Sequence, residues 1–158
     1  MHEDRAKEGL RLGDFLPYQL AIAANAVGGR IAQQYHARFG LKAIEWRMMA
    51  VLGDRGEATQ RELALASLMD KVAVNRACRV LEGRGLVERH PYAGDRRSHR
   101  LALTAEGRAM HRRILPLARA MERELLAPFT PEEREELMRL LIRLRESAGA
   151  FEPPRLEE

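Results

Sequence analysis

Residues 59–83 read TQRELALASLMDKVAVNRACRVLEG, and this stretch decides the fold. It opens with Thr59-Gln60-Arg61-Glu62, the pattern of a capping box, in which a hydroxyl and a carboxylate satisfy each other's free backbone amides. That pattern predicts a short helix over residues 60–66. A turn over 67–70 separates it from a second helix over 71–83, so the stretch is typical of two helices joined at a tight turn.

The second of these helices has two chemically different faces. One face follows the spacing i, i+3, i+4, i+7 and consists of Val74, Ala77, Cys78 and Leu81. The opposite face carries Val72, Asn75, Arg76 and Arg79. Because residues at this spacing share one side of a helix, we expect the first set in the core and the second set at the surface.

A β-hairpin is expected after these helices. Residues 85–89 (GLVER) and 100–104 (RLALT) are short stretches that we expect to pair as antiparallel strands. The polar, basic segment 92–99 between them would form the loop at the tip of the hairpin. This tip contains Asp95, Arg96, Arg97, Ser98 and His99.

Two helices are expected before the stretch 59–83. The first would be long, beginning after Asp14 as its N-cap and ending near residue 39, because Gly40 suits the left-handed conformation that often closes a helix. The next would cover residues 43–52, with Trp46 among its core residues. The glycine-containing segment 53–56 after it is typical of a loop.

Two further helices are expected after the hairpin. The one that begins at residue 105 contains Pro116, which has no amide hydrogen to donate, so we expect a kink there. The last would begin at a Thr130 cap and end near residue 147. One face of this last helix carries Leu137, Leu140, Leu141 and Leu144.

The predicted fold is therefore mainly α with a small β-hairpin wing, in the order of four helices, a hairpin and two helices. Residues 43–104 would form a winged helix-turn-helix DNA-binding domain. Residues 14–42 and 105–148 would form a helical dimerisation region, because the leucine face of the last helix would otherwise be an exposed apolar patch. We expect the ends, 1–12 and 149–158, to be mobile.

The charge distribution agrees with a DNA-binding role. The chain has a formal net charge of +4, and residues 71–113 carry eleven Lys and Arg against four acidic side chains. In the major groove, Arg pairs with guanine and Asn with adenine, so Asn75, Arg76 and Arg79 could read bases. We expect Lys71 and the amides at the start of its helix to contact phosphate. Arg96 and Arg97 at the hairpin tip suit the narrow minor groove.

These features resemble the MarR family of bacterial regulators over residues 14–148. The segments that carry the resemblance are TQRELA at 59–64, MDKVAVNR at 69–76, LEGRGLVER at 81–89, DRRS at 95–98 and LTAEG at 103–107. The resemblance implies a homodimer that binds double-stranded DNA at a palindromic operator. It also implies that Arg97 enters the minor groove while Asp95 orients it or a neighbouring basic side chain. Asn75 departs from the Ser or Thr of many relatives, which leaves the base preference open.

A small-molecule effector is the second partner that the resemblance implies, with aromatic acids, phenols or their thioesters as common effectors. Polar groups among small and apolar residues describe a ligand site, and the sequence offers such a set. Its members are Tyr18, Asn25, His36, Trp46 and Met49. The alternative for each of them is ordinary packing or exposure to solvent.

Other classes of protein find little support in the sequence. There is one cysteine, Cys78, so an internal disulfide and a cysteine zinc site are excluded, and its position on the inward face predicts a core residue rather than a redox sensor. No metal-ligand spacing, catalytic constellation or phosphate loop stands out, so we expect no cofactor and no enzyme. No stretch would span a membrane, and we expect a cytoplasmic protein. A winged helix used for protein–protein assembly, without specific DNA binding, is the alternative function.

Overall fold

The computed structural model describes residues 11–92 and 95–150, while the side chains of residues 92 and 95–98 lie outside that description. The chain divides into two compact units at Pro116, residues 1–116 and 117–158. Of the ends that were expected to be mobile, residues 1–10 and 151–158 lie outside the described residues.

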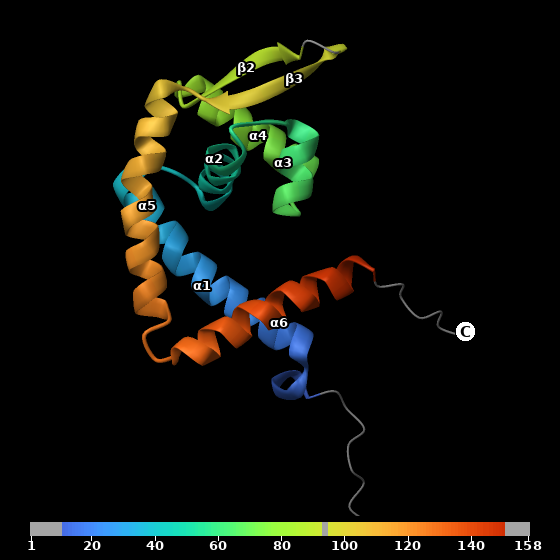
Figure 1. The fold of residues 1–158 in the computed structure, drawn as a ribbon, viewed down its shortest axis with the longest axis vertical. Helices are drawn as coiled ribbons and strands as arrows, with labels where there is room; N and C mark the ends of the chain where they lie inside the picture. Colours follow the sequence, from blue (N-terminus) through green and yellow to red (C-terminus); the bar gives the residue numbers. More distant parts are fainter. Residues whose placement is uncertain (1–10, 93–94, 151–158) are drawn as a thin grey trace, which may run out of the picture. The chain divides into compact units, whose positions relative to one another are not determined.

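Six α-helices and a small sheet make up the described part of the chain (Figure 1). The helices are α1 (Leu16–Phe39), α2 (Ala43–Arg55), α3 (Gln60–Ser67), α4 (Lys71–Gly83), α5 (Ala105–Leu125) and α6 (Pro131–Gly149). The strands are β1 (Glu57–Thr59), β2 (Val87–Tyr92) and β3 (Asp95–Leu103), antiparallel in the order β1-β3-β2. The predicted order of elements is confirmed, and β1 is an addition that the sequence pattern did not reveal.

Side-chain caps explain where several helices begin. The Oγ1 of Thr59 accepts a hydrogen bond from the amide of Glu62 at 3.2 Å, and the Oε2 of Glu62 accepts one from the amide of Thr59 at 2.7 Å. Thr130 and Glu133 repeat this exchange at the start of α6, with distances of 3.2 and 2.8 Å. Gly40 ends α1 at φ 63°, in the left-handed conformation. These local signals therefore predicted the starts of α3 and α6 and the end of α1 correctly.

Two predicted helix boundaries are wrong. Asp14 is not the N-cap of α1: it lies in a short 3₁₀-helix, Leu12–Asp14, and the capping position is Phe15, which has no side-chain cap bond. The segment 53–55 is helical rather than a loop, because α2 continues to Arg55. Gly53 faces the ring of His111, where a Cβ would come within 2.5 Å of Nε2, so the glycine is used for close packing rather than for a turn.

The hairpin strands are also longer than predicted. β2 runs to Tyr92 and β3 begins at Asp95, so most of the expected loop over 92–99 belongs to the ladder. The ladder pairs Val87 with Leu103 at the base, and its register shifts between Pro91 and Tyr92. The hairpin is therefore an extended two-stranded ribbon, with β1 on the outer edge of β3.

The core of the first unit lies between α2, α3, α4 and the base of the hairpin (Figure 1). The four residues predicted on the inward face of α4 are all buried: Val74, Ala77, Cys78 and Leu81. Other large, fully buried side chains are those of Leu41, Met48, Met49, Leu52, Leu63, Leu86 and Leu101. The amphipathic pattern of α4 thus fixes which side of this helix remains outside.

Thr104 and Gly107 attach α5 to the base of the hairpin. The Oγ1 of Thr104 donates to the carbonyl of Gly85 at 2.6 Å and accepts from the amide of Gly107 at 3.0 Å. The amide of Thr104 donates to the carbonyl of Leu86 at 3.1 Å. A Cβ on Gly107 would lie 1.9 Å from that same carbonyl oxygen, so only glycine allows this approach.

Candidate nucleic-acid interface

The outer face of α4 is open and basic. Lys71, Arg76 and Arg79 are exposed, and Val72 keeps 65% of its surface. Because the opposite face of the helix fills the core, rotation of α4 is fixed and these side chains must point outward. A helix with a cationic face and no covering element is the shape that enters a major groove.

Asp70 changes the role that was expected for the start of α4. Its Oδ1 accepts hydrogen bonds from the amides of Val72 at 2.8 Å and Ala73 at 3.1 Å. Two of the amides that would have contacted phosphate are therefore already satisfied, and a carboxylate lies where the phosphate was expected. The amides of Val72 and Ala73 are therefore not free for the expected phosphate contact, and the expectation for Lys71 rests on its exposed ammonium group.

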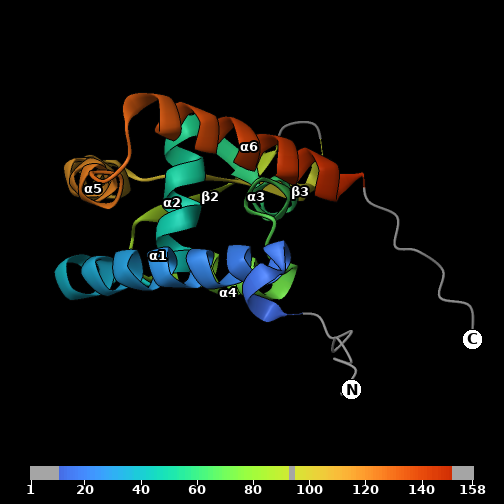
Figure 2. The same ribbon diagram turned by 90° about the horizontal axis from the view of Figure 1, so that it is seen from below.

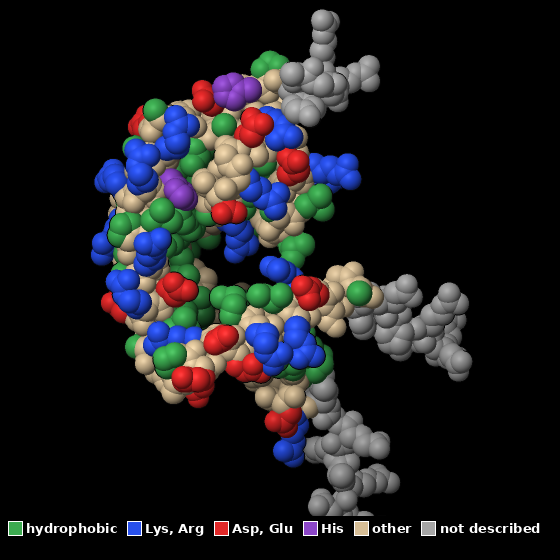
Figure 3. All heavy atoms as spheres, in the orientation of Figure 1, with side chains coloured by type: hydrophobic (Ala, Val, Ile, Leu, Met, Phe, Trp, Pro, Cys, Tyr) green, Lys and Arg blue, Asp and Glu red, His purple; other side chains and the backbone are tan. Residues whose placement is uncertain are grey.

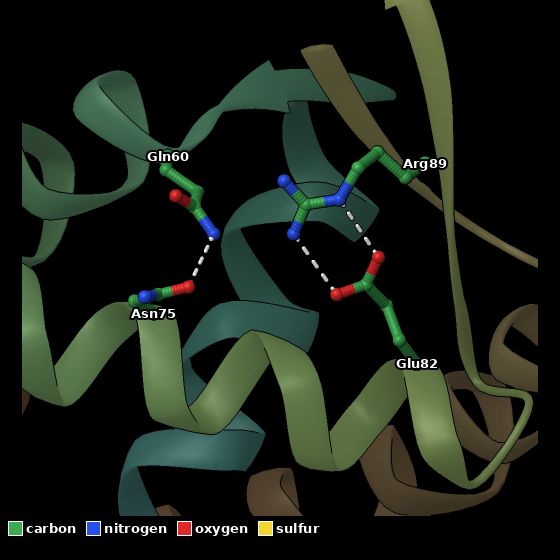
Figure 4. A network of polar contacts seen from close by, with 4 residues as sticks. All are labelled: Gln60, Asn75, Glu82 and Arg89. Atoms are coloured by element: carbon green, nitrogen blue, oxygen red, sulfur yellow. Dashed lines mark hydrogen bonds and ion pairs between the residues drawn. The ribbon is translucent and has the colours of Figure 1, made fainter.

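Asn75 differs from its neighbours because it is half-buried and already has a partner. The Nε2 of Gln60, the first residue of α3, donates to the Oδ1 of Asn75 at 3.0 Å (Figure 4). This bond joins the two helices of the helix-turn-helix directly. Gln60 was not identified from the sequence, since the bond spans fifteen residues and no local spacing indicates it.

An ion pair connects the end of α4 to the hairpin. The Nε and Nη2 of Arg89 on β2 donate to the two carboxylate oxygens of Glu82 at 2.9 and 3.0 Å (Figure 4). The hydrogen bonds from Arg89 lower the pKa of Glu82 below its usual value, so the carboxylate is charged. A two-point contact between planar groups sets their orientation as well as their distance. It therefore fixes the base of the hairpin relative to α4.

The wing residues are described only in part. The backbone of 95–98 belongs to β3, but the side chains of the four predicted residues lie outside the described part: Asp95, Arg96, Arg97 and Ser98. His99 is described, exposed, and opposite Pro91 in the ladder. The position of these residues on the outer half of the ribbon follows from the strand register.

The five effector candidates do not form one cluster within the chain. Tyr18 and His36 are both exposed, and they lie eighteen residues apart on α1, which is about 27 Å along a helix. Asn25 is exposed on the same helix, and Met49 is completely buried in the core. Trp46 is half-buried on α2.

Trp46 instead belongs to a small aromatic cluster that the sequence did not indicate. Its ring lies 5.2 Å from the ring of Tyr35 on α1 and stacks on His111 of α5 at 5.5 Å between centroids. Burial raises the pKa of Tyr35, an effect that a hydrogen bond to Trp46 reduces. Burial, followed by the charge of Arg112, lowers the pKa of His111. The cluster therefore joins three helices of the first unit with a neutral imidazole at neutral pH.

Apolar side chains lie uncovered on two helices. On α6 the four predicted dimerisation residues, Leu137, Leu140, Leu141 and Leu144, keep 39%, 45%, 41% and 36% of their surface. Figure 3 shows a row of hydrophobic side chains along this helix. The first half of α1, whose full length is visible in Figure 2, also contains no buried residue. Exposed leucine faces of this length are typical of a surface that another chain covers.

The described residues contain no group of three His, Cys, Asp or Glu side chains that could hold a metal ion. Among the same residues, no helix is both long and apolar enough to cross a lipid bilayer.

Comparisons with known proteins agree with this geometry. The sequence profile of the MarR family matches residues 39–98, which include the helix-turn-helix and most of the hairpin. The HTH-type transcriptional regulator PecS of Dickeya dadantii is 30% identical over 118 residues, which cover 73% of this chain and 71% of PecS. The HTH-type transcriptional repressor NicR of Pseudomonas putida is 29% identical over 117 residues, which cover 74% of this chain and 74% of NicR.

Solved structures give the same result. A MarR/EmrR family transcriptional regulator from Acinetobacter sp. ADP1 has a TM-score of 0.84 at 25% identity, over 90% of this chain and all of that one. A cysteine-to-serine variant of MarR from E. coli, complexed with operator DNA, has a TM-score of 0.75 at 22% identity and covers 86% of this chain and 99% of its own. Bordetella bronchiseptica BpsR, studied for regulation of its DNA binding by 6-hydroxynicotinic acid, has a TM-score of 0.76 at 22% identity, over 87% of this chain and 98% of its own. The chain belongs to the MarR family of winged helix-turn-helix transcriptional regulators, which is a family of DNA-binding proteins and not a class of enzymes.

Proposed function

We propose that this protein is a homodimeric repressor that binds a palindromic operator and is released from it by a small aromatic effector. The observation that carries the proposal is the uncovered basic face of α4, with Lys71, Arg76 and Arg79 exposed opposite a buried apolar face. A surface of this kind has no role in the core of the protein, and its charge suits the phosphates and guanines of a major groove.

The contacts of each half-site divide between α4 and the wing. Arg76 and Arg79 read base edges or phosphate in the major groove, and Lys71 contacts phosphate. Val72, exposed beside them, suits contact with a thymine methyl group. Arg97 enters the adjacent minor groove with Asp95 orienting the basic tip, and Arg96, Ser98 and His99 contact the backbone there.

A second copy of the chain covers the exposed apolar faces. The helical dimerisation region consists of residues 14–42 and 105–148, and the leucines of α6 are its central contacts. Isologous pairing of such a face buries it on both chains and presents two α4 helices to successive major grooves, about 34 Å apart. A palindromic operator follows from this twofold symmetry.

The effector acts by changing the separation of the two α4 helices. It can shift this equilibrium only by binding one spacing more tightly than the other. Four of the five candidates have exposed surface that a ligand could contact: Tyr18, Asn25 and His36 on α1, and the half-buried Trp46 on α2. Met49 is completely buried and has none. A related fold whose DNA binding is regulated by 6-hydroxynicotinic acid supports an aromatic acid as the effector class.

The test of DNA binding is a gel-shift titration with the DNA upstream of the protein's own gene, repeated at several salt concentrations. Specific binding should survive competitor DNA and weaken steeply with salt, because cation release follows every phosphate contact. Arg97→Ala should cost about 1–3 kcal/mol of operator affinity, and Arg76→Ala should also relax base preference. Arg145→Ala, an exposed arginine on α6, is the matched control and should change little.

Unchanged binding in both Arg76→Ala and Arg97→Ala would reject the proposed contacts. Tight dimers with no retention of specific DNA would instead favour a winged helix that assembles with other proteins. The effector is tested separately, by screening aromatic acids and their coenzyme A thioesters for release of bound DNA. Sedimentation of Leu141→Glu, which places a charge in the apolar face of α6, tests the dimer: a monomer is expected.

A further inference from the structure

Among the residues on the outer face of α4, Asn75 is the one whose hydrogen bonding is most restricted by the structure. A free asparagine can recognise adenine with both ends of its amide, since the oxygen accepts from N6 and the nitrogen donates to N7. In this protein the oxygen already accepts a hydrogen bond from the Nε2 of Gln60 at 3.0 Å. In Figure 4 the dashed line ends on that oxygen, and the side chain of Gln60 comes from the neighbouring helix.

The position of Gln60 is itself fixed. The residue is the first of α3 and lies inside the capping box of Thr59 and Glu62, whose two hydrogen bonds hold the backbone at this point. Leu63, one turn later, is completely buried and anchors α3 against the core. Both Gln60 and Asn75 are half-buried, so their hydrogen bond is partly shielded from competing water.

We infer that Gln60 is a specificity-determining residue that turns Asn75 into a hydrogen-bond donor and directs it to guanine. This inference rests on the proposed insertion of α4 into the major groove. With its oxygen held toward α3, Asn75 presents its amide nitrogen, which has two hydrogens to donate. Guanine offers two acceptors in the major groove, N7 and O6, whereas adenine offers N7 beside an amino group that is itself a donor. The usual pairing of asparagine with adenine is thereby replaced, at Asn75, by pairing with guanine.

The experiment begins with selection of binding sites by the full-length protein from a pool of duplexes with a randomised core. In the selected site, each purine is then replaced in turn by its 7-deaza analogue, which lacks the N7 acceptor. One guanine per half-site should be sensitive in the wild-type protein, with about a tenfold loss of affinity, and insensitive in Asn75→Ala. This comparison assigns the base that Asn75 contacts.

Two substitutions of Gln60 then test the direction of the amide. Gln60→Glu has no hydrogen to donate, so Asn75 must turn its nitrogen to the carboxylate and present its oxygen to the DNA. The preference at the assigned position should change from guanine to a base with an amino group, adenine or cytosine, by about tenfold. Gln60→Ala releases the amide and should favour adenine, which can then be read by both ends.

The measured quantity is the ratio of affinities for two bases at one position. The added charge of Gln60→Glu weakens binding to every duplex equally and therefore cancels from this ratio. Gln33→Glu on α1, which is exposed, is the matched control and should keep the guanine preference.

The outcomes separate this inference from the proposed function. Failure of the wild-type protein to enrich any sequence would overturn both. Enrichment of a site at which no purine depends on Asn75, or at which both Gln60 variants keep the wild-type preference, would overturn the inference alone. A guanine that loses its advantage in both variants supports it.

Discussion

Gly107→Ala is the substitution for which the structure gives the sharpest expectation. The added Cβ would lie 1.9 Å from the carbonyl oxygen of Leu86 and 2.9 Å from its carbonyl carbon. These are backbone atoms of the residue that precedes β2, so no side-chain rotation relieves the overlap. The start of α5 must move by more than 1 Å, and the hydrogen bonds that Thr104 makes with Gly85 and Leu86 must lengthen or break.

The expected cost follows from three contributions. Overpacking costs about 1–3 kcal/mol. Loss of the two Thr104 bonds costs about 1 kcal/mol each. The higher helix propensity of alanine returns about 1 kcal/mol. The free energy of unfolding should therefore fall by about 2–4 kcal/mol, a large share of the roughly 5–15 kcal/mol of an ordinary domain.

The assay is urea denaturation followed by circular dichroism, with all variants at one protomer concentration because the stability of the proposed dimer depends on it. Gly83→Ala is the matched control: it lies in the last turn of α4, and a Cβ there meets nothing within 4 Å. That control should be neutral or slightly stabilising. A loss of less than about 1 kcal/mol for Gly107→Ala would refute the argument, since ordinary surface substitutions already reach about half of that value.

Three further predictions concern other contacts of the first unit. Arg84→Ala removes hydrogen bonds to the carbonyls of Phe39 and Gly40 at 2.9 and 3.0 Å, so it should lower the free energy of unfolding by about 1 kcal/mol. Arg84→Lys should lose less, because it keeps a cation at the C-terminus of α1. Equal losses in the two variants would show that the charge at the helix end contributes nothing. Burial lowers the pKa of His111 from 6.5, so the unfolded chain takes up the proton first as the pH falls. Stability should therefore decline below about pH 6.5 more in the wild-type protein than in His111→Phe, as measured by denaturation at pH 5 and pH 8. Parallel pH profiles would show that the imidazole is not held neutral. Burial raises the pKa of Cys78 to about 11, so a thiol reagent at pH 8 should label it slowly in the folded protein and fully in urea, and fast labelling of the folded protein would disprove the burial.

Local patterns predicted much of the fold because their partners lie within a few residues. The extent of α4 follows from the turn over 67–70 and from the i, i+3, i+4, i+7 spacing of its buried face, which repeats within one helix. The same holds for the capping boxes that begin α3 and α6. The exposed arginines of α4 follow as well, because a helix that buries one face must expose the other.

Features that depend on distant segments were missed or misassigned. Strand β1 has three residues and pairs with β3, more than forty residues later, so no local signal indicates it. Gly53 looked like a loop residue, but it lies within α2, where the ring of His111 leaves no room for a side chain. The aromatic cluster around Trp46 likewise depends on His111 of α5, which is remote from Tyr35 and Trp46 in the sequence.

The amino-acid sequence by itself determined the order of elements, the orientation of α4 and the family to which the chain belongs. Only the tertiary structure decided how the outward face of α4 and the wing are arranged: Arg89 fixes the wing to Glu82, and Gln60 holds the oxygen of Asn75. The physical reason lies in range. Helical periodicity and capping act over three or four residues, whereas a side-chain hydrogen bond between two elements requires their packing to be in place first.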